Sequence, residues 1–306
     1  MLKTLLAKNL CKILIHRGQG LIALNMKGWY TPMEQVTAVE SRGFWENMWA
    51  NVKHSFKAFG TAEYWKDLAH QTTGWHPTSY MLFGFAVGLQ LLTFVNAPIT
   101  TLSTITMIAV ILGVACILSI AQAKQLNGWL GLISAVLFIY VAFHAKNYMQ
   151  IAEQIVYMVT LDIPVLLNVD WNKNMSKKIG KLNKSGWIVT IIGWGVIWAV
   201  SSVLIGHFTD DPRPVIDSMV FATATIGGLL TFYKKRESFF AWILTGVTSL
   251  VLWAITFQQG DASIAMLLSS LVYVMNDAIG ITVSPWFSKK GRERLAQQEA
   301  EYLANK

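Results

Sequence analysis

The feature that most constrains this chain is a series of long apolar runs, interrupted by few charges, between residues 80 and 283. A helix needs about 20 apolar residues to cross the hydrocarbon core of a bilayer, and about 17–25 are seen in practice. Only 14% of the 306 residues are charged, against about 25% in a soluble domain. The sequence therefore predicts an all-α polytopic membrane protein with eight transmembrane helices, at 80–96, 99–121, 128–145, 148–168, 185–207, 214–233, 238–257 and 262–283.

The basic residues predict how these helices cross the membrane. Cytoplasmic loops of membrane proteins carry an excess of Lys and Arg. With eight spans and a cytoplasmic N-terminus, every Lys and Arg except Lys146 and Arg213 falls on the cytoplasmic side. We therefore expect both termini in the cytoplasm. The net charge of +8 is then explained by membrane topology, so the expected partner is the lipid bilayer and not a nucleic acid.

The first 79 residues precede the spans and differ from them in character. Their beginning has apolar residues on one helical face, opposite lysines, at Leu2, Leu5, Leu6, Leu10, Ile13 and Leu14. This pattern indicates an amphipathic helix lying on the membrane surface, although a helix that faces solvent fits it as well. Basic residues interrupt the stretch throughout, which is not typical of a signal peptide.

The residue types that usually carry catalysis or hold a metal are not grouped in this sequence. Cys11 and Cys116 lie on segments of different character, and the six histidines show no ligand spacing. No phosphate-binding glycine loop of the P-loop type is present. We therefore expect neither an enzyme nor a metal or cofactor.

Two stretches of the sequence resemble each other. Residues 155–171 read "IVYMVTLDIPVLLNVDW" and residues 271–286 read "LVYVMNDAIGITVSPW". A single-residue gap aligns Tyr157 with Tyr273, Asp162 with Asp277 and Trp171 with Trp286. Chance similarity between apolar helices is the alternative. The matched positions favour two copies of a three-helix unit, with the fifth span restoring a common orientation between them.

This repeat predicts a SWEET-like 3+1+3 core with one extra helix at its N-terminal side. The expected divisions are a cytoplasmic or interfacial region, the extra helix, a first three-helix bundle, a linker with the connecting helix, a second bundle and a cytoplasmic tail. Their boundaries are 1–79, 80–97, 98–171, 172–213, 214–286 and 287–306.

Four acidic residues fall within the predicted spans. Ionisable groups in a bilayer are costly, and they favour a functional interpretation. These residues are Glu153, Asp162, Asp217 and Asp277, and no Lys or Arg lies deep in a span to pair with them. The two repeat-matched residues, Asp162 and Asp277, are expected to line one polar cavity. A protonated Asp hydrogen-bonded to a neighbouring helix is the structural alternative.

The seventh span carries aromatic and small residues on one face. Its sequence "FFAWILTGVTSLVLW" places five residues along that face: Phe239, Trp242, Gly246, Ser249 and Trp253. The matching third span has a similar stripe at Asn127, Gly131, Ser134 and Phe138. Two such stripes predict a slot for a planar ring with a polar appendage. A packing seam of small residues is the alternative.

The sequence also resembles a known family over about residues 99–286. The residues that carry the resemblance are "NGWLGLISAVLF" at 127–138, Gln154, and "DSMVFATATIGGLLTFYKKRESFFAW" at 217–242. They are similar to the PnuC vitamin transporters, which take up nicotinamide riboside. The resemblance implies two parallel three-helix bundles joined by one helix, a homotrimer, and a place in the bacterial cytoplasmic membrane. It also implies facilitated diffusion, with a cytoplasmic kinase trapping the substrate.

The resemblance has three departures. The family pattern Trp-x-x-Trp-x-x-x-Asn reads here as Phe239, Trp242 and Gly246, and Ser134 replaces the matching Asn on the third span. Members of the wider family resemble carriers of thiamine, riboflavin or deoxynucleosides, which remain alternatives. A proton-coupled symporter that uses Asp162 or Asp277 is a further alternative.

The expected site combines these observations. Phe239 and Trp242 would stack on a ring, polar side chains would bond its appendage, and a carboxylate would offset a positive charge. The candidate substrate-binding residues are Phe239, Trp242, Gly246, Ser249, Gln154, Asn127, Ser134, Asp162, Asp277 and Tyr157.

Overall fold

The computed structural model describes residues 44–168, 171 and 175–304. In this part of the chain, eight helical segments are long and apolar enough to cross a membrane, which confirms the predicted fold class. They are α4 (Pro77–Val95), α5 (Thr101–Ala121), α6 (Asn127–His144), α7 with its continuation, α10 (Lys184–Phe208), α11 (Pro214–Phe232), α12 (Ser238–Gln258) and α13 (Ile264–Val283). The amphipathic helix predicted at the N-terminus lies outside the described residues.

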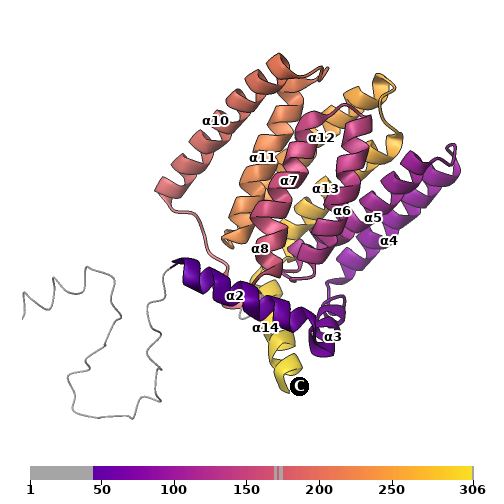
Figure 1. Ribbon diagram of the computed structural model, residues 1–306. Helices are drawn as coiled ribbons and strands as arrows, with labels where there is room; N and C mark the ends of the chain where they lie inside the picture. Colours follow the sequence, from indigo (N-terminus) through magenta and orange to yellow (C-terminus); the bar gives the residue numbers. More distant parts are fainter. Residues whose placement is uncertain (1–43, 169–170, 172–174, 305–306) are drawn as a thin grey trace, which may run out of the picture. The chain divides into compact units, whose positions relative to one another are not determined.

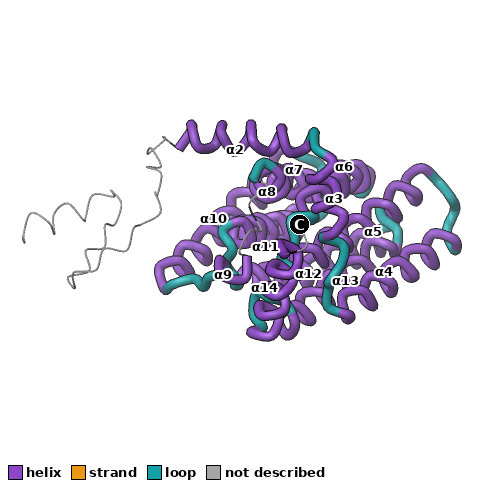
Figure 2. Tube along the Cα trace, turned by 90° about the horizontal axis from the view of Figure 1, so that it is seen from below, coloured by secondary structure: helices purple, strands orange, loops and turns teal. Residues whose placement is uncertain are grey.

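Four shorter helices lie at one end of this bundle: α2 (Phe44–Phe59), α3 (Ala62–His70), α9 (Met175–Lys178) and α14 (Lys289–Ala304) (Figures 1 and 2). We call this the α14 end, and the opposite end, where the α10–α11 loop carries Arg213, the Arg213 end. Helix α3 and its following loop bind α14: His70 stacks on Tyr302, and the Gln298 amide donates to the Gly74 carbonyl at 2.7 Å.

The turns between helices repeat along the chain. A residue with positive φ lies two positions after the last residue of α5 and of α11: Ala123 and Lys234, both at 56°. Lys146 (53°) and Gly260 (82°) lie at the same distance after α6 and α12. In each turn the next N–H bonds a carbonyl five residues earlier, at 2.8–3.1 Å, as in a Schellman motif. The units α5–α6–α7 and α11–α12–α13 are therefore two copies of one architecture.

The two units pack against each other in a matched way. Within them, α5 contacts α6 and α6 contacts α7, just as α11 contacts α12 and α12 contacts α13. Between them, α7 contacts α11 and α13 contacts α5. Helix α4 packs on α5 and α13, whereas α10 lies on the outside against α11 (Figure 1). Helix α10 is apolar on all sides and buries little, which is typical of a helix surrounded by lipid.

The third helix of the first unit is irregular. Helix α7 (Tyr148–Tyr157) continues through a π-helical turn, η2 (Met158–Asp162), into α8 (Ile163–Leu166). Pro164 is the second residue of α8, and proline cannot donate the regular i→i−4 hydrogen bond. A π-turn accommodates one residue more than a regular helix. The corresponding helix α13 is regular throughout its length.

Candidate substrate-binding site

A cavity of about 140 Å³ lies among helices of both repeats. Its size is close to the roughly 150 Å³ engineered cavity in another protein that holds benzene. The walls come from α5, α6, α7 with η2, α12 and α13, so each three-helix unit contributes to the cavity. Nine of the ten predicted site residues line it: Ser134, Gln154, Tyr157, Asp162, Phe239, Trp242, Gly246, Ser249 and Asp277.

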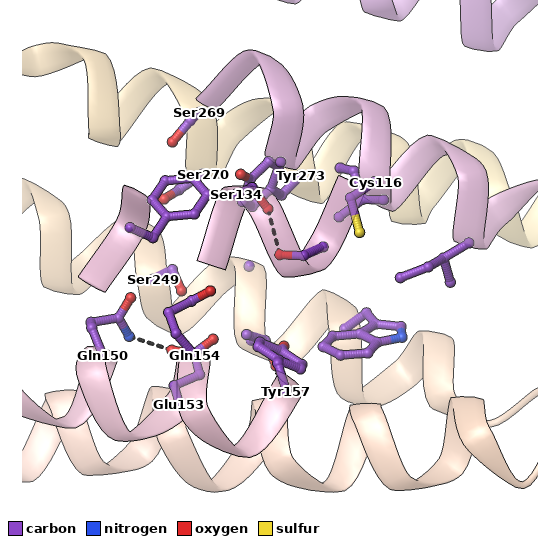
Figure 3. A pocket seen from close by; sticks show the side chains of 18 of the residues that line it. Cys116, Ser134, Gln150, Glu153, Gln154, Tyr157, Ser249, Ser269, Ser270 and Tyr273 are labelled. Atoms are coloured by element: carbon purple, nitrogen blue, oxygen red, sulfur yellow. Dashed lines mark hydrogen bonds between the residues drawn. The ribbon is translucent and has the colours of Figure 1, made fainter. Parts of the chain in front are cut away.

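The half of the cavity nearer the Arg213 end is polar. Figure 3 shows Gln150, Glu153 and Gln154 on α7 facing serine hydroxyls from the opposite side. The Gln150 amide donates to a Glu153 carboxyl oxygen at 2.6 Å. The serines come from α12 and α13, at Ser249, Ser269 and Ser270. Amide, carboxyl and hydroxyl groups at one end can bond a ligand that carries several hydroxyls.

The opposite half is aromatic. The ring of Trp242 lies 5.5 Å from the ring of Tyr157, centroid to centroid, with 31° between their planes. The indole N–H donates to the Thr231 hydroxyl at 3.0 Å. A Cβ on Gly227 would come within 2.9 Å of the indole, so the glycine lets the ring lie against the α11 backbone. Trp242 is therefore fixed in orientation and presents a rigid aromatic surface to the cavity.

The repeat-matched carboxyl groups meet at this cavity. Asp162 is 3% exposed and Asp277 is 6% exposed, and both line it. The Asn276 amide donates to Asp277 at 3.1 Å. Gly131 leaves room for the Asp162 side chain, because a Cβ there would collide with its carboxyl group. Among the residues that the structure places around the cavity, none is Lys, Arg or His, so these acids face no positive charge there.

Two predicted residues have mainly structural surroundings. Phe239 is 1% exposed and packs on Trp286, with ring centroids 6.0 Å apart, so it presents little surface to a ligand. Gly246 lines the cavity, but a Cβ there would come within 2.6 Å of the Val274 side chain. The glycine therefore allows α12 to approach α13, and a larger side chain at this position would disturb that contact.

Asn127 is the one predicted site residue that the structure does not place around this cavity. It is the first residue of α6, fully buried toward the α14 end. Its backbone oxygen accepts from the Cys116 thiol at 3.5 Å, and its amide group has no partner in the described part of the chain. Helical spacing assigned it to the correct face, but one turn beyond the end of the cavity.

Several lining residues do not stand out as site residues in the sequence. Glu153 is predicted as an intramembrane acid and not as part of the site, and its partner Gln150 is not predicted. The same holds for Ser269 and Ser270, although they lie one turn before Tyr273 on the same helix. Small hydroxyl residues occur often in membrane helices for packing reasons, so their spacing alone did not distinguish them.

Comparisons with known proteins agree with this architecture. Residues 103–287 match the family described as nicotinamide mononucleotide transporter. The nicotinamide riboside transporter PnuC of Neisseria mucosa is 26% identical over 219 residues, covering 68% of this chain and 80% of that protein. The PnuC of Haemophilus influenzae is 24% identical over 190 residues, covering 60% and 82%.

A solved structure gives the same fold. The crystal structure of the vitamin B3 transporter PnuC superposes with a TM-score of 0.60. The match covers 78% of this chain and all of that chain, at 19% identity. The family match spans more than half of the sequence and includes both three-helix repeats. The chain therefore belongs to the nicotinamide mononucleotide transporter family, which includes the PnuC proteins.

Proposed function

We propose that this protein is a membrane transporter for nicotinamide riboside or a closely related nucleoside-like vitamin precursor. The observation that carries the proposal is a cavity shared by the two repeats, with an aromatic wall, carboxyl groups and polar side chains. The curated relatives in Neisseria and Haemophilus carry the name of nicotinamide riboside transporters. Transport between two matched helical units is the known use of such repeats.

The chemistry of the cavity fits a cationic ring. The pyridinium ring of nicotinamide riboside is planar and positively charged. Trp242 and Tyr157 offer aromatic faces to which such a ring is attracted. Glu153, Asp162 and Asp277 supply carboxyl groups around the same space. Gln150, Gln154 and the serines would bond the sugar hydroxyls.

The same chemistry argues against a phosphorylated ligand. The family description names the mononucleotide, whereas the two relatives are named for the riboside. Phosphate groups in proteins are usually held by Arg, Lys or clusters of backbone N–H groups. The lining residues in the described chain include no basic side chain and three acids. We infer that the riboside is bound and the mononucleotide is rejected.

We propose facilitated diffusion as the mode of transport, with metabolic trapping of the substrate inside the cell. A proton-coupled symporter is the second candidate, because Asp162 and Asp277 are buried without a basic partner in the cavity. Thiamine, riboflavin and deoxynucleosides are the alternative substrates. Each contains a planar ring that Trp242 would accept.

The membrane arrangement is also a proposal. We place the protein in the bacterial cytoplasmic membrane with both termini, and hence the α14 end, in the cytoplasm. The concentration of basic residues at this end supports that orientation. The exposed apolar surface of α10 leaves room for contacts with lipid or with other copies in a homotrimer.

Uptake into proteoliposomes tests the function. Purified protein is reconstituted, and uptake of labelled nicotinamide riboside is measured with unlabelled substrate inside and with an uncoupler present. Facilitated diffusion predicts rapid exchange that the uncoupler does not reduce. Loss of uptake with the uncoupler would support the symporter instead. If nicotinamide riboside is not exchanged and thiamine, riboflavin or deoxyadenosine is, the exchanged compound replaces nicotinamide riboside as the proposed substrate.

A further inference from the structure

Arg213 is a buried cation at the end of the bundle farthest from α14. Its side chain is only 2% exposed. Its Nε donates to the Asn147 side-chain oxygen at 3.0 Å, and one Nη donates to the Ala145 carbonyl at 2.6 Å. The other Nη pairs with the Asp261 carboxylate at 3.0 Å and also bonds the Gln259 side chain. Each of the three guanidinium nitrogens therefore has at least one partner.

These partners come from equivalent loops of the two repeats. Ala145 and Asn147 flank the turn that ends α6, and Gln259 and Asp261 flank the matching turn that ends α12. One guanidinium group thus joins the same loop in both units. A second bond crosses nearby, from the Asn147 amide to the Thr256 hydroxyl at 3.4 Å. Because Arg213 directly precedes α11, its bonds to Ala145 and Asn147 hold the second unit to the first, and its bonds to Gln259 and Asp261 keep the guanidinium group in position. Separation of the two units at this end requires the bonds to Ala145 and Asn147 to break.

A second cavity lies beside these loops. It has a volume of about 250 Å³ and is lined by the α4–α5 loop, the start of α5 and the α12–α13 loop. Ala145 and Asp261, both bonded to Arg213, belong to its wall. Met266 lines this cavity and also the substrate-binding cavity. Met266, a flexible side chain, therefore contacts both spaces.

The size of the substrate-binding cavity indicates why the bonds of Arg213 matter for transport. About 140 Å³ is close to the space that one six-membered ring needs, and a ring with an attached sugar is larger. A nucleoside therefore needs more space than this cavity offers, and movement of the two units apart would supply it. The polar end of the cavity, which would hold the sugar, includes Ser269 and Ser270, which follow Met266 on α13 at the Arg213 end.

We propose that Arg213 is the latch that closes the Arg213 end of the transporter. Substrate passes between the second cavity and the binding cavity by way of Met266. In this structure the latch is engaged. Asp261 and Gln259 hold the guanidinium group against the α6–α7 loop, so losing them weakens its bonds to Ala145 and Asn147 and frees the two repeats to part at this end. The inference rests on the proposed transport function, but its test does not depend on the substrate.

The native thiol of Cys116 makes the test direct, because this residue lines the binding cavity (Figure 3). In a Cys11→Ser background Cys116 is the sole thiol of the chain. The rate at which a small polar methanethiosulfonate labels it then reports how often the cavity opens. We expect Asp261→Asn and Arg213→Gln to raise this rate about tenfold or more, which is a shift of about 1.4 kcal/mol toward the open state.

A matched control separates the latch from a general effect of charge. Asp210 lies at the same end and pairs with Lys146 at 3.7 Å, but both side chains are exposed. Asp210→Asn therefore makes the same chemical change without releasing Arg213, and its labelling rate should equal that of the parent. Gel filtration and thermal melting identify any variant that fails to fold, and Asp261→Asn, which keeps the shape of the side chain, is the milder of the two latch variants.

Adding Met266→Trp to Asp261→Asn tests the route. A larger side chain between the two cavities should return the labelling rate to that of the parent. Equal rates in Asp261→Asn, Asp210→Asn and the parent, all folded, would overturn the latch. A raised rate that Met266→Trp leaves unchanged would overturn the route. Failure of nicotinamide riboside to exchange in proteoliposomes would contradict the proposed substrate and leave these labelling results unaffected.

Discussion

The third helices of the two repeats present matching side chains to the cavity with different backbone conformations. In the second repeat, α13 is regular, and Asp277 follows Tyr273 by four positions. In the first repeat, Asp162 follows Tyr157 by five positions, and the π-turn η2 begins after Tyr157 and ends at Asp162. All four side chains line the cavity. The single-residue gap in the sequence alignment is therefore the extra residue of the π-turn.

This comparison shows which property of the two helices is maintained. An extra residue in a regular helix would rotate everything after it by about 100°. The π-turn absorbs the residue locally, so Asp162 faces the cavity as Asp277 does, and Trp171 and Trp286, beyond the helix ends, are both buried. Pro164, which would disturb a regular helix, is tolerated in the first repeat because the turn before it is already irregular.

The largest effect should come from deleting one residue in each helix. Removing Met275, which lies between Tyr273 and Asp277, should rotate Asp277 and Trp286 out of register and abolish folding. Removing Val159 from η2, together with Pro164→Ala, should convert the π-turn into regular helix and leave a folded protein. Size-exclusion chromatography and thermal melting of the two purified variants would show this difference. Equal tolerance of both deletions would contradict our explanation of the gap.

A smaller effect is expected from neutralising the matched carboxyl groups. Asp162→Asn and Asp277→Asn should each weaken binding of cationic nicotinamide riboside by about tenfold, because each removes one charge near the ring. Neutral deoxyadenosine should be unaffected. Isothermal titration of both ligands would measure the change. A much larger effect in one variant than in the other would show that the repeats do not share the charge evenly.

The smallest effect concerns the turns at the α14 end. Ala123 and Lys234 are equivalent, but the Lys234 ammonium is half-buried and donates to the Trp171 carbonyl at 2.6 Å. Burial, with nearby Lys178 adding to it, lowers the pKa of Lys234 to about 8. The unfolded chain, with an ordinary lysine pKa, binds more protons between about pH 8 and pH 10. The stability of the folded protein should therefore rise with pH across this range.

Thermal melting of the parent and of Lys234→Met would measure this contribution. The parent should gain stability between pH 8 and pH 10 relative to the variant, which carries no titrating group at this position. Lys235→Met is the control, because Lys235 is the next residue in the same turn. A pH dependence that survives in Lys234→Met would assign the effect to another group.

Much of the fold could be predicted from the sequence, and the reason is physical. The length of an apolar run in the sequence predicts a membrane span directly, so the predicted limits of the eight helices are close to the observed ones. The matched Asp162 and Asp277 were also placed at a common cavity, because a buried acid without a basic neighbour is rare enough to be informative.

Other features could not be predicted because they depend on neighbouring helices. Spacing identified the face that contains Gly246, but not that Val274 of α13 presses against it. The same spacing included Asn127, which lies beyond the end of the cavity. The bonds of Arg213 could not be predicted, because its four partners come from loops that are 46 to 68 residues away in the sequence.

The central claim is that the cavity between the repeats binds a planar cationic nucleoside against Trp242. Isothermal titration with nicotinamide riboside tests it most directly, in the parent, in Trp242→Ala and in Trp187→Ala. Trp187→Ala is the control, because the Trp187 indole on α10 lies against Phe240 and does not line the cavity. Stacking of a base on an aromatic side chain is worth about 1–3 kcal/mol. We therefore expect Trp242→Ala to lose about tenfold or more in affinity and Trp187→Ala to bind like the parent. Equal affinity in the parent and in folded Trp242→Ala would contradict the account.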